Sequence, residues 1–214
     1  MSLTVKFCGL RTPETLQAAL DAGADWVGFV FFPKSPRSVT PDQARDLDAL
    51  VGTHAKKVAL LVDADDALIA SVIEALHPDF LQLHGHETPE RVFEIKQRFG
   101  VPLIKALGIG SAEDLTRAAS YAPLVDWLLF DAKPPKDSAL PGGNGVSFDW
   151  TLLKQVAKQP PFMVSGGLDA TNVANALAIS GAQGVDVSSG IESAPGIKDP
   201  QRMASFMAAL RQSV

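Results

Sequence analysis

Short apolar runs rich in β-branched and aromatic residues alternate along the chain with longer segments in which apolar residues recur every three or four positions. The first pattern is typical of a buried strand and the second of an amphipathic helix, so the alternation predicts repeated βα units around a parallel sheet. We expect eight strands, at Thr4–Cys8, Trp26–Phe31, Lys57–Val62, Phe80–His84, Leu103–Leu107, Trp127–Asp131, Phe162–Ser165 and Gly184–Ser188.

A helical segment follows each predicted strand. Several of these segments start at Ser, Thr or Asp with Pro in the first turn, which is a common signal for a helix N-terminus. The expected starts lie near Pro13, Pro41, Asp65, Thr88, Ser111, Phe148, Asp169 and Asp199. Eight units in 214 residues leave about 27 residues per unit, which is short but sufficient for an eight-stranded parallel (β/α)8 TIM barrel. We therefore predict a single α/β barrel domain over residues 1–214.

The competing α/β architecture is an open, doubly wound sheet. It rarely needs eight nearly equal units, and no G-x-G-x-x-G motif follows the first predicted strand, where a dinucleotide-binding fold would carry it. The Pro- and Gly-rich segment 133–146 has the length of a functional loop after the sixth strand, and we interpret it so instead of as a domain linker.

Composition narrows the class of protein. Hydrophobic residues make up 46% of the chain, charged residues 20%, and the net charge is −5 without any basic run, which argues against a disordered chain, a membrane protein and a nucleic-acid binder. The lone cysteine, Cys8, excludes an intramolecular disulfide and favours a reducing compartment. With no secretory signal pattern at the N-terminus, we expect a cytoplasmic enzyme.

In a barrel of this kind the active site lies at the C-terminal ends of the strands, so polar residues that close apolar runs are the informative ones. Arg37 joins them from the loop after the second strand. The strand-end residues are Cys8, Asp63, His84, Lys105, Asp131, Ser165 and Ser188.

Cys8 and Asp131 are the candidate proton-transfer residues. A thiol can act as a base or nucleophile, although most free cysteines are small buried hydrophobic residues. A carboxyl at the end of an apolar strand can serve as a general acid if its proton is retained. The alternatives for Asp131 are a helix cap or a surface pair with Lys133, whose charge would favour the ionised carboxylate.

His84 and His86 share one strand face at i, i+2 spacing, which raises the question of a metal site. The remaining histidines, His54 and His77, fall in helix-to-strand connections at the opposite end of the barrel. We therefore expect no metal. His84 is interpreted as a hydrogen-bonding residue of the pocket wall, and His86 as a solvated loop residue.

Two glycine-containing turns suggest a phosphate site. Ser165–Gly167 follows the seventh predicted strand and Ser188–Gly190 the eighth, and the loops after these two strands often hold phosphate through backbone N–H groups. Either turn alone is common turn chemistry, but together they favour a phosphorylated ligand. The segment Gly142–Gly145 is either a lid, a further phosphate contact or a plain flexible loop.

Seven motifs, in order and across essentially the whole chain, resemble the phosphoribosylanthranilate isomerase family of tryptophan biosynthesis. They are Val5–Leu10, Val27–Arg37, Leu81–Gly85, Leu129–Asp131 with Lys133, Gly142–Gly145 with Phe148–Trp150, Ser165–Leu168 and Val185–Glu192. Phe7 stands where the family usually carries Ile, and Asn144 where Ser or Thr is common.

The resemblance implies a cofactor-free Amadori rearrangement of N-(5-phosphoribosyl)anthranilate, with Cys8 as general base and Asp131 as general acid. It also implies that Arg37 holds the anthranilate carboxylate, a role suited to a planar fork of donors. The expected substrate-binding residues are Arg37, His84, Gly143, Gly145, Ser165, Gly166, Gly167, Asp186, Ser188, Ser189 and Gly190. The expected partner is the small phosphorylated substrate, with no nucleic acid or membrane, and a monomer is favoured over a dimer.

Three other functions remain open. The isomerase of histidine biosynthesis, or an enzyme that serves both pathways, shares the expected fold, but that relative normally has two carboxylates at its strand ends, whereas the first strand here ends in Cys8. A Schiff-base aldolase would use Lys105. A non-catalytic sensor of a phosphorylated ligand is a third possibility, and the pairing of an acid with a base argues against it.

Overall fold

Eight parallel strands close into a barrel in the computed structural model, which describes residues 3–133, 142–156 and 160–212. The strands pair in sequence order, and β1 also pairs with β8, so that no edge remains open. Their bounds are β1 Thr4–Cys8, β2 Trp26–Phe31, β3 Lys56–Leu61, β4 Phe80–Leu83, β5 Leu103–Ile109, β6 Trp127–Ala132, β7 Phe162–Val164 and β8 Gly184–Val187. The predicted (β/α)8 barrel is confirmed.

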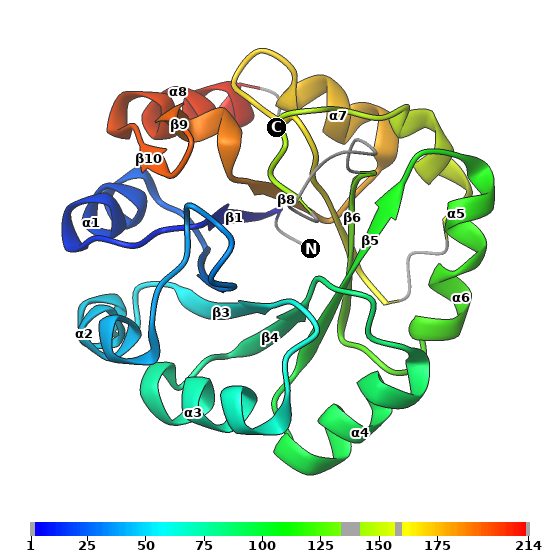
Figure 1. Cartoon of the computed structure of the whole chain (residues 1–214). Coiled ribbons are helices and arrows are strands. Elements are labelled where there is room, and N and C mark those ends of the chain that lie inside the picture. Colours follow the sequence, from blue (N-terminus) through cyan, green and yellow to red (C-terminus); the bar gives the residue numbers. More distant parts are fainter. Residues whose placement is uncertain (1–2, 134–141, 157–159, 213–214) are drawn as a thin grey trace.

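The helices form an outer ring around the strands (Figure 1). The α-helices are α1 Pro13–Ala22, α2 Pro41–Val51, α3 Asp66–Leu76, α4 Pro89–Phe99, α5 Ala112–Thr116, α6 Ala118–Tyr121, α7 Val173–Ser180 and α8 Pro200–Arg211. Residues near the two chain ends meet, because α1 and α8 lie side by side (Figure 1). Several starts carry the expected caps: in α2, Thr40 and Gln43 form a reciprocal capping box.

Two local predictions need correction. The helix expected near Phe148 is the 3-10 helix η1, Trp150–Gln155, whose first turn is capped by Asp149. The helix expected after Ser111 is divided into α5 and α6, at a point where the Thr116 hydroxyl donates to the Glu113 carbonyl and so competes with regular helix bonding.

The structure also contains a short hairpin that the sequence pattern did not predict. After β8 come the 3-10 helix η2, Ser189–Ile191, and the antiparallel strands β9, Glu192–Ala194, and β10, Ile197–Lys198. The turn at Gly196 has φ +79° and lies so close to the loop after β2 that a Cβ there would be 2.6 Å from the Pro36 carbonyl oxygen. The hairpin is therefore packed against the segment that carries Arg37.

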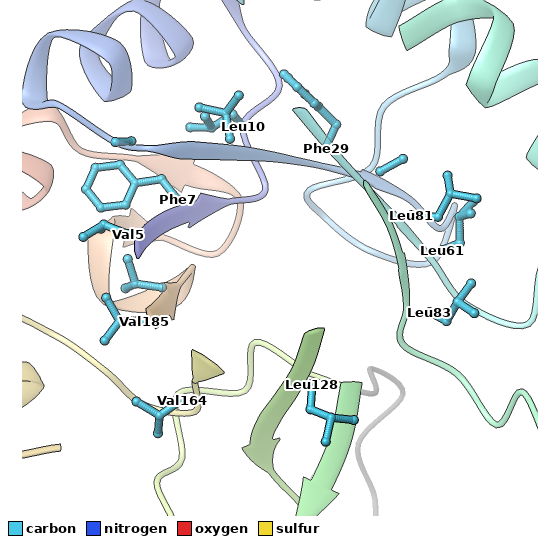
Figure 2. Packing of buried hydrophobic residues seen from close by; sticks show 14 of the residues in the cluster. Val5, Phe7, Leu10, Phe29, Leu61, Leu81, Leu83, Leu128, Val164 and Val185 are labelled. Carbon is cyan, nitrogen blue, oxygen red and sulfur yellow. The ribbon is translucent and has the colours of Figure 1, made fainter. Parts of the chain in front are cut away.

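The side chains of each strand alternate between two environments. One set points outward and packs against the helices, as Phe7, Phe29 and Leu81 do (Figure 2). The other set fills the barrel interior, where Trp26 stacks on Phe80 with ring centroids 4.5 Å apart. This alternation decides which polar residues can reach the site at the mouth of the barrel.

Candidate active site

A pocket opens at the C-terminal ends of the strands and has an empty volume of about 660 Å³, open space at its mouth included. Its polar lining comes from strands and loops far apart in the chain. Of the site residues predicted from the sequence, Cys8, Arg37, His84, Asp131, Gly143, Ser165, Gly166, Gly167, Asp186, Ser188 and Ser189 line it. Gly145 and Gly190 line an adjacent hollow, which Gly167 and Ser189 also border.

Cys8 closes β1 with its side chain turned into the barrel beside Val30 and Leu60. It is 3% exposed, so it is buried as a small apolar residue would be, yet it also forms part of the pocket wall. Burial raises the pKa of the Cys8 thiol above its ordinary value, and the charges of Lys6 and Lys198 offset this only in part. In the free protein the thiol form therefore dominates at neutral pH.

An ion pair lies beneath Cys8. The Lys6 ammonium donates to Asp186 Oδ1 at 2.7 Å, and both side chains are buried. Burial alone would lower the pKa of Lys6, but the attraction of Asp186 and Cys8 outweighs it and leaves the pKa raised. Lys6 is thus held as a cation below the thiol, and the Asp186 carboxylate is fixed at the pocket floor, where Ser165 Oγ approaches its Oδ2 at 3.4 Å.

Asp131 is a second buried carboxyl of the site, and its contacts decide whether it pairs with Lys133. The Ala132 N–H donates to Asp131 Oδ1 at 2.8 Å, and His84 Nε2 lies 3.4 Å from Oδ2. Lys133 does not pair with it: its ammonium, on a side chain 60% exposed, bonds Asp114 at 3.1 Å instead. The surface-pair interpretation of Asp131 is therefore wrong.

His84 lies between Asp131 and the barrel interior. Its Nδ1 lies 2.9 Å from Gln82 Nε2, an inward side chain of β4, while its Nε2 faces Asp131. If the Gln82 amide donates to Nδ1, Nε2 is the ring nitrogen left to carry a proton on the side that faces the carboxyl. His84 lines the pocket, as expected, and its approach to Asp131 was not predicted from the sequence.

Gly142 and Gly143 approach the site so closely that side chains would not fit. A Cβ on Gly142 would lie 2.6 Å from Asp131 Oδ2, and one on Gly143 would lie 2.6 Å from Arg37 Nη1. The glycine loop thus lies over both the Asp131 carboxyl and the Arg37 guanidinium. Residues 134–141, which begin this predicted loop, lie outside the described residues.

The turns expected to bind phosphate lie side by side. Gly166 and Gly167 have φ values of +85° and +61°, and their N–H groups donate to no acceptor among the residues that the structure describes. A Cβ on Gly190 would lie 1.8 Å from the Leu168 carbonyl oxygen, so the loops after β7 and β8 are in contact. Unpaired N–H groups at this end of a barrel suit a phosphate group.

Lys105 does not belong to this pocket, which corrects its assignment to a strand end. Strand β5 continues to Ile109, and the inward positions next to Lys105 are Ile104 and Ala106. The ammonium of Lys105 faces outward and donates to Glu87 Oε2 at 2.8 Å and to the carbonyls of Leu83 and Gly85. Three acceptors occupy its three N–H donors, so it is not placed as a Schiff-base nucleophile.

The other candidates for ligands are scattered. Asp63 accepts from the His86 N–H and supports the loop after β4, and the His86 side chain is 92% exposed. His54 and His77 line a hollow at the N-terminal end of the strands. Within residues 3–133, 142–156 and 160–212, no three His, Cys, Asp or Glu side chains gather as a metal site would need. No helix in these same ranges has the length and apolar character to cross a membrane.

Comparison with known proteins decides the family. A sequence model described as N-(5'phosphoribosyl)anthranilate (PRA) isomerase matches residues 5–209. The protein named N-(5'-phosphoribosyl)anthranilate isomerase from Rhodopseudomonas palustris strain BisB5 is 57% identical, covering 100% of this chain and 98% of its own. The chain belongs to the phosphoribosylanthranilate isomerase family.

Solved structures of the family superpose over nearly the whole chain. Phosphoribosyl anthranilate isomerase from Thermotoga maritima has a TM-score of 0.88 at 33% identity, covering 98% of this chain and 99% of its own. A second structure, of the isomerase in complex with reduced 1-(o-carboxyphenylamino)-1-deoxyribulose 5-phosphate, has a TM-score of 0.83 at 30% identity, with the same coverage.

Four buried charged or polar residues support the site but were not predicted from the sequence as site residues. They are Gln82, Glu87, Glu192 and Lys198. All are buried and act on predicted site residues or on the loops that carry them. Glu192 ends a motif that carried the family resemblance, so its charge two residues after the Ser188–Gly190 turn was the available signal. Gln82 lies in the Leu81–Gly85 motif, so a polar side chain within an apolar strand was the available signal there.

Proposed function

We propose that this chain catalyses the Amadori rearrangement of N-(5'-phosphoribosyl)anthranilate to 1-(o-carboxyphenylamino)-1-deoxyribulose 5-phosphate in tryptophan biosynthesis. The observation that carries the proposal is one pocket that joins a thiol from β1 to a buried carboxyl from β6, beside two glycine turns suited to phosphate. A family member that binds the reduced product supports the substrate class. A cytoplasmic, monomeric and cofactor-free enzyme remains our prediction.

The acid step belongs to Asp131. In its protonated form the carboxyl transfers a proton to the furanose ring oxygen, the C1′–O bond breaks, and the anthranilate nitrogen lone pair forms the Schiff base. His84 and the Ala132 N–H fix the orientation of the carboxyl, and the nearby glycine loop limits its contact with water.

The base step belongs to Cys8. Its thiolate removes the C2′ proton, and the electron pair of that bond forms the C1′=C2′ double bond of an enolamine. The enolamine then gains a proton at C1′ and loses one from the C2′ hydroxyl, which gives the ketone. Because burial raises the pKa of Cys8, the reactive thiolate is a minor species, and Lys6 and Lys198 supply the positive charge that stabilises it.

Substrate orientation requires an anion site at each end of the ligand. The Ser165–Gly167 and Ser188–Gly190 turns receive the phosphate, and Arg37, on the loop after β2, receives the anthranilate carboxylate. Gly143, Gly145 and Asp186 complete the proposed binding surface. Holding both ends places C1′ and C2′ between Cys8 and Asp131.

The histidine-pathway type of isomerisation is the second candidate, because it shares the fold and a phosphorylated substrate. The thiol at the end of β1, where that relative normally has a carboxylate, favours the anthranilate substrate. The test is to add the purified chain to freshly prepared phosphoribosylanthranilate and follow anthranilate fluorescence, with the histidine-pathway aminoaldose in a parallel assay. We expect turnover of the first substrate; turnover of the second alone would overturn the proposal.

A further inference from the structure

Glu192, the first residue of β9, lies at the centre of a buried charged cluster and is the one member of it without a role in the proposed chemistry. Its side chain is 3% exposed and accepts from two cations. Arg37 Nε donates to Oε1 at 2.7 Å and Arg37 Nη2 donates to Oε2 at 2.8 Å, while Lys198 Nζ donates to Oε1 at 2.8 Å. We call Arg37, Glu192 and Lys198 the charge cluster.

The bidentate pair fixes which edge of the Arg37 guanidinium faces the pocket. Glu192 takes the Nε and Nη2 edge, and the Gly143 carbonyl also accepts from Nη2, at 3.3 Å. The Nη1 atom lies toward the glycine loop, where a Cβ on Gly143 would be 2.6 Å away. A planar group held along one edge in this way has little freedom to rotate.

The charges of the cluster leave it net positive. Burial would raise the pKa of Glu192, but the hydrogen bond from Arg37 and the charge of Lys198 outweigh it and bring the pKa below its ordinary value, so the carboxylate is ionised. Lys198 has three acceptors, namely Glu192, the Ser188 carbonyl and Ser188 Oγ, which match the three donors of an ammonium. Burial lowers the pKa of Lys198 and the charge of Glu192 opposes this, so the ammonium form depends on Glu192 and on the three acceptors. With Lys198 as an ammonium, two cations and one anion leave a single positive charge for one incoming carboxylate.

We propose that Glu192 is a positioning residue, which holds Arg37 in the orientation that binds the aromatic carboxylate of the substrate, while Lys198 prevents Glu192 from cancelling the charge of Arg37. This inference rests on the proposed function. The cluster also joins the carboxylate end of the site to the reacting end, because Ser188, which Lys198 contacts, donates through Oγ to the Cys8 carbonyl at 3.1 Å.

The test compares two substrates that differ in the group Arg37 would bind: phosphoribosylanthranilate and the phosphoribosyl derivative of aniline, which lacks the carboxylate. Glu192→Asp keeps the charge but is one methylene too short to keep both hydrogen bonds to Arg37. We expect KM for the carboxylated substrate to rise at least about tenfold, the scale of a lost charge-assisted hydrogen bond, with kcat changed less than about threefold. KM for the aniline derivative should stay within about twofold.

A matched control is Glu87→Asp, which shortens another buried glutamate in a lysine pair, on the outer side of β5 and away from Arg37. It should not discriminate between the two substrates. In an Arg37→Ala background, Glu192→Asp should cause no further rise in KM. Equal losses on both substrates, or no loss at all, would reduce Glu192 to a structural residue and overturn the inference.

Lys198→Met provides a second route if Glu192→Asp does not fold. It leaves a neutral Arg37–Glu192 pair, so KM should again rise for the carboxylated substrate alone. Because the charge of Lys198 also stabilises the Cys8 thiolate, kcat should fall on both substrates. An equal KM change for both substrates would also overturn the inference. The wild-type assay separates the two proposals. If the wild-type chain does not convert phosphoribosylanthranilate, the proposed function fails. If it does, and these variants show no preference, only the role of Glu192 fails.

Discussion

The chemistry assigned to Cys8 depends on a conflict between burial and charge. The thiol lies in an apolar layer with Val30 and Leu60, which disfavours the thiolate, while the Lys6 ammonium below it favours the thiolate. Burial is the larger effect. The sequence predicts a cysteine at the end of the first strand. It does not predict how far burial and the charge of Lys6 shift the pKa of that cysteine, because the side chains around Cys8 come from strands remote in the chain.

The rate of alkylation of Cys8 as a function of pH measures the pKa of its thiol. Because only the thiolate reacts, the rate of iodoacetamide modification should rise with pH, and its midpoint should lie above the ordinary cysteine pKa of about 8.5. The raised pKa of Cys8 gives the sign: the anion is the disfavoured form, so more alkaline solution is needed to populate it. A midpoint at or below the ordinary value, in the folded protein, would contradict the burial argument.

At the scale of the elements, alternation along each strand separates site residues from supporting ones. On β6, Leu129 and Asp131 point inward, while Phe130 packs against the helices. The same rule turns Lys105 outward, so its pairing with Glu87 supports the loop after β4 instead of the reaction. The sequence showed a lysine in an apolar strand but not its face, because both faces of this strand are apolar and the period of two is hidden.

The barrel and the starts of most helices were predictable, since caps and buried runs are local signals. The hairpin of β9 and β10 was not. It consists of five strand residues, and its position depends on the contact of Gly196 with Pro36, which is a tertiary feature. Its consequence for the site is large, because Glu192 contacts Arg37 from the hairpin and Lys198, on the same hairpin, contacts Glu192.

Contact between the loops after β7 and β8 leads to a prediction about Gly190. Replacing it with Ala would place a Cβ 1.8 Å from the Leu168 carbonyl oxygen, so the two loops would have to separate. We expect affinity for the reduced, phosphate-bearing product to fall at least about tenfold, the scale of one lost charge-assisted hydrogen bond. Isothermal titration calorimetry measures this affinity directly.

Gly100→Ala is the control for Gly190→Ala. Gly100 ends α4 with φ +66° and has nothing within 4 Å of its ideal Cβ position, so the change adds backbone strain without a collision. Its cost should be about 1 kcal/mol of stability, with affinity for the reduced product unaltered. Unchanged affinity in Gly190→Ala as well would show that the loop contact does not shape the phosphate site.

For the whole molecule, closure of the barrel is what creates the site. Pairing of β1 with β8 brings Cys8 next to Asp186 and Ser188, and the ring as a whole places Asp131 of β6 in the same pocket. No local stretch of sequence contains this arrangement. It could be anticipated from the sequence only because strand ends in such a barrel share one mouth and because the ordered motifs resemble a known family.

The most direct test of the account compares kcat of the wild-type chain with that of Cys8→Ala and Asp131→Asn on phosphoribosylanthranilate, with Kd for the reduced product measured in parallel. Each variant removes one proton-transfer group from the pocket and leaves the anion sites in place. We expect kcat to fall by about 10²–10⁴ in each variant, the range for loss of a positioned acid or base, while Kd hardly changes. A near-normal kcat in either variant, with the protein folded, would contradict the assignment of that residue as acid or base.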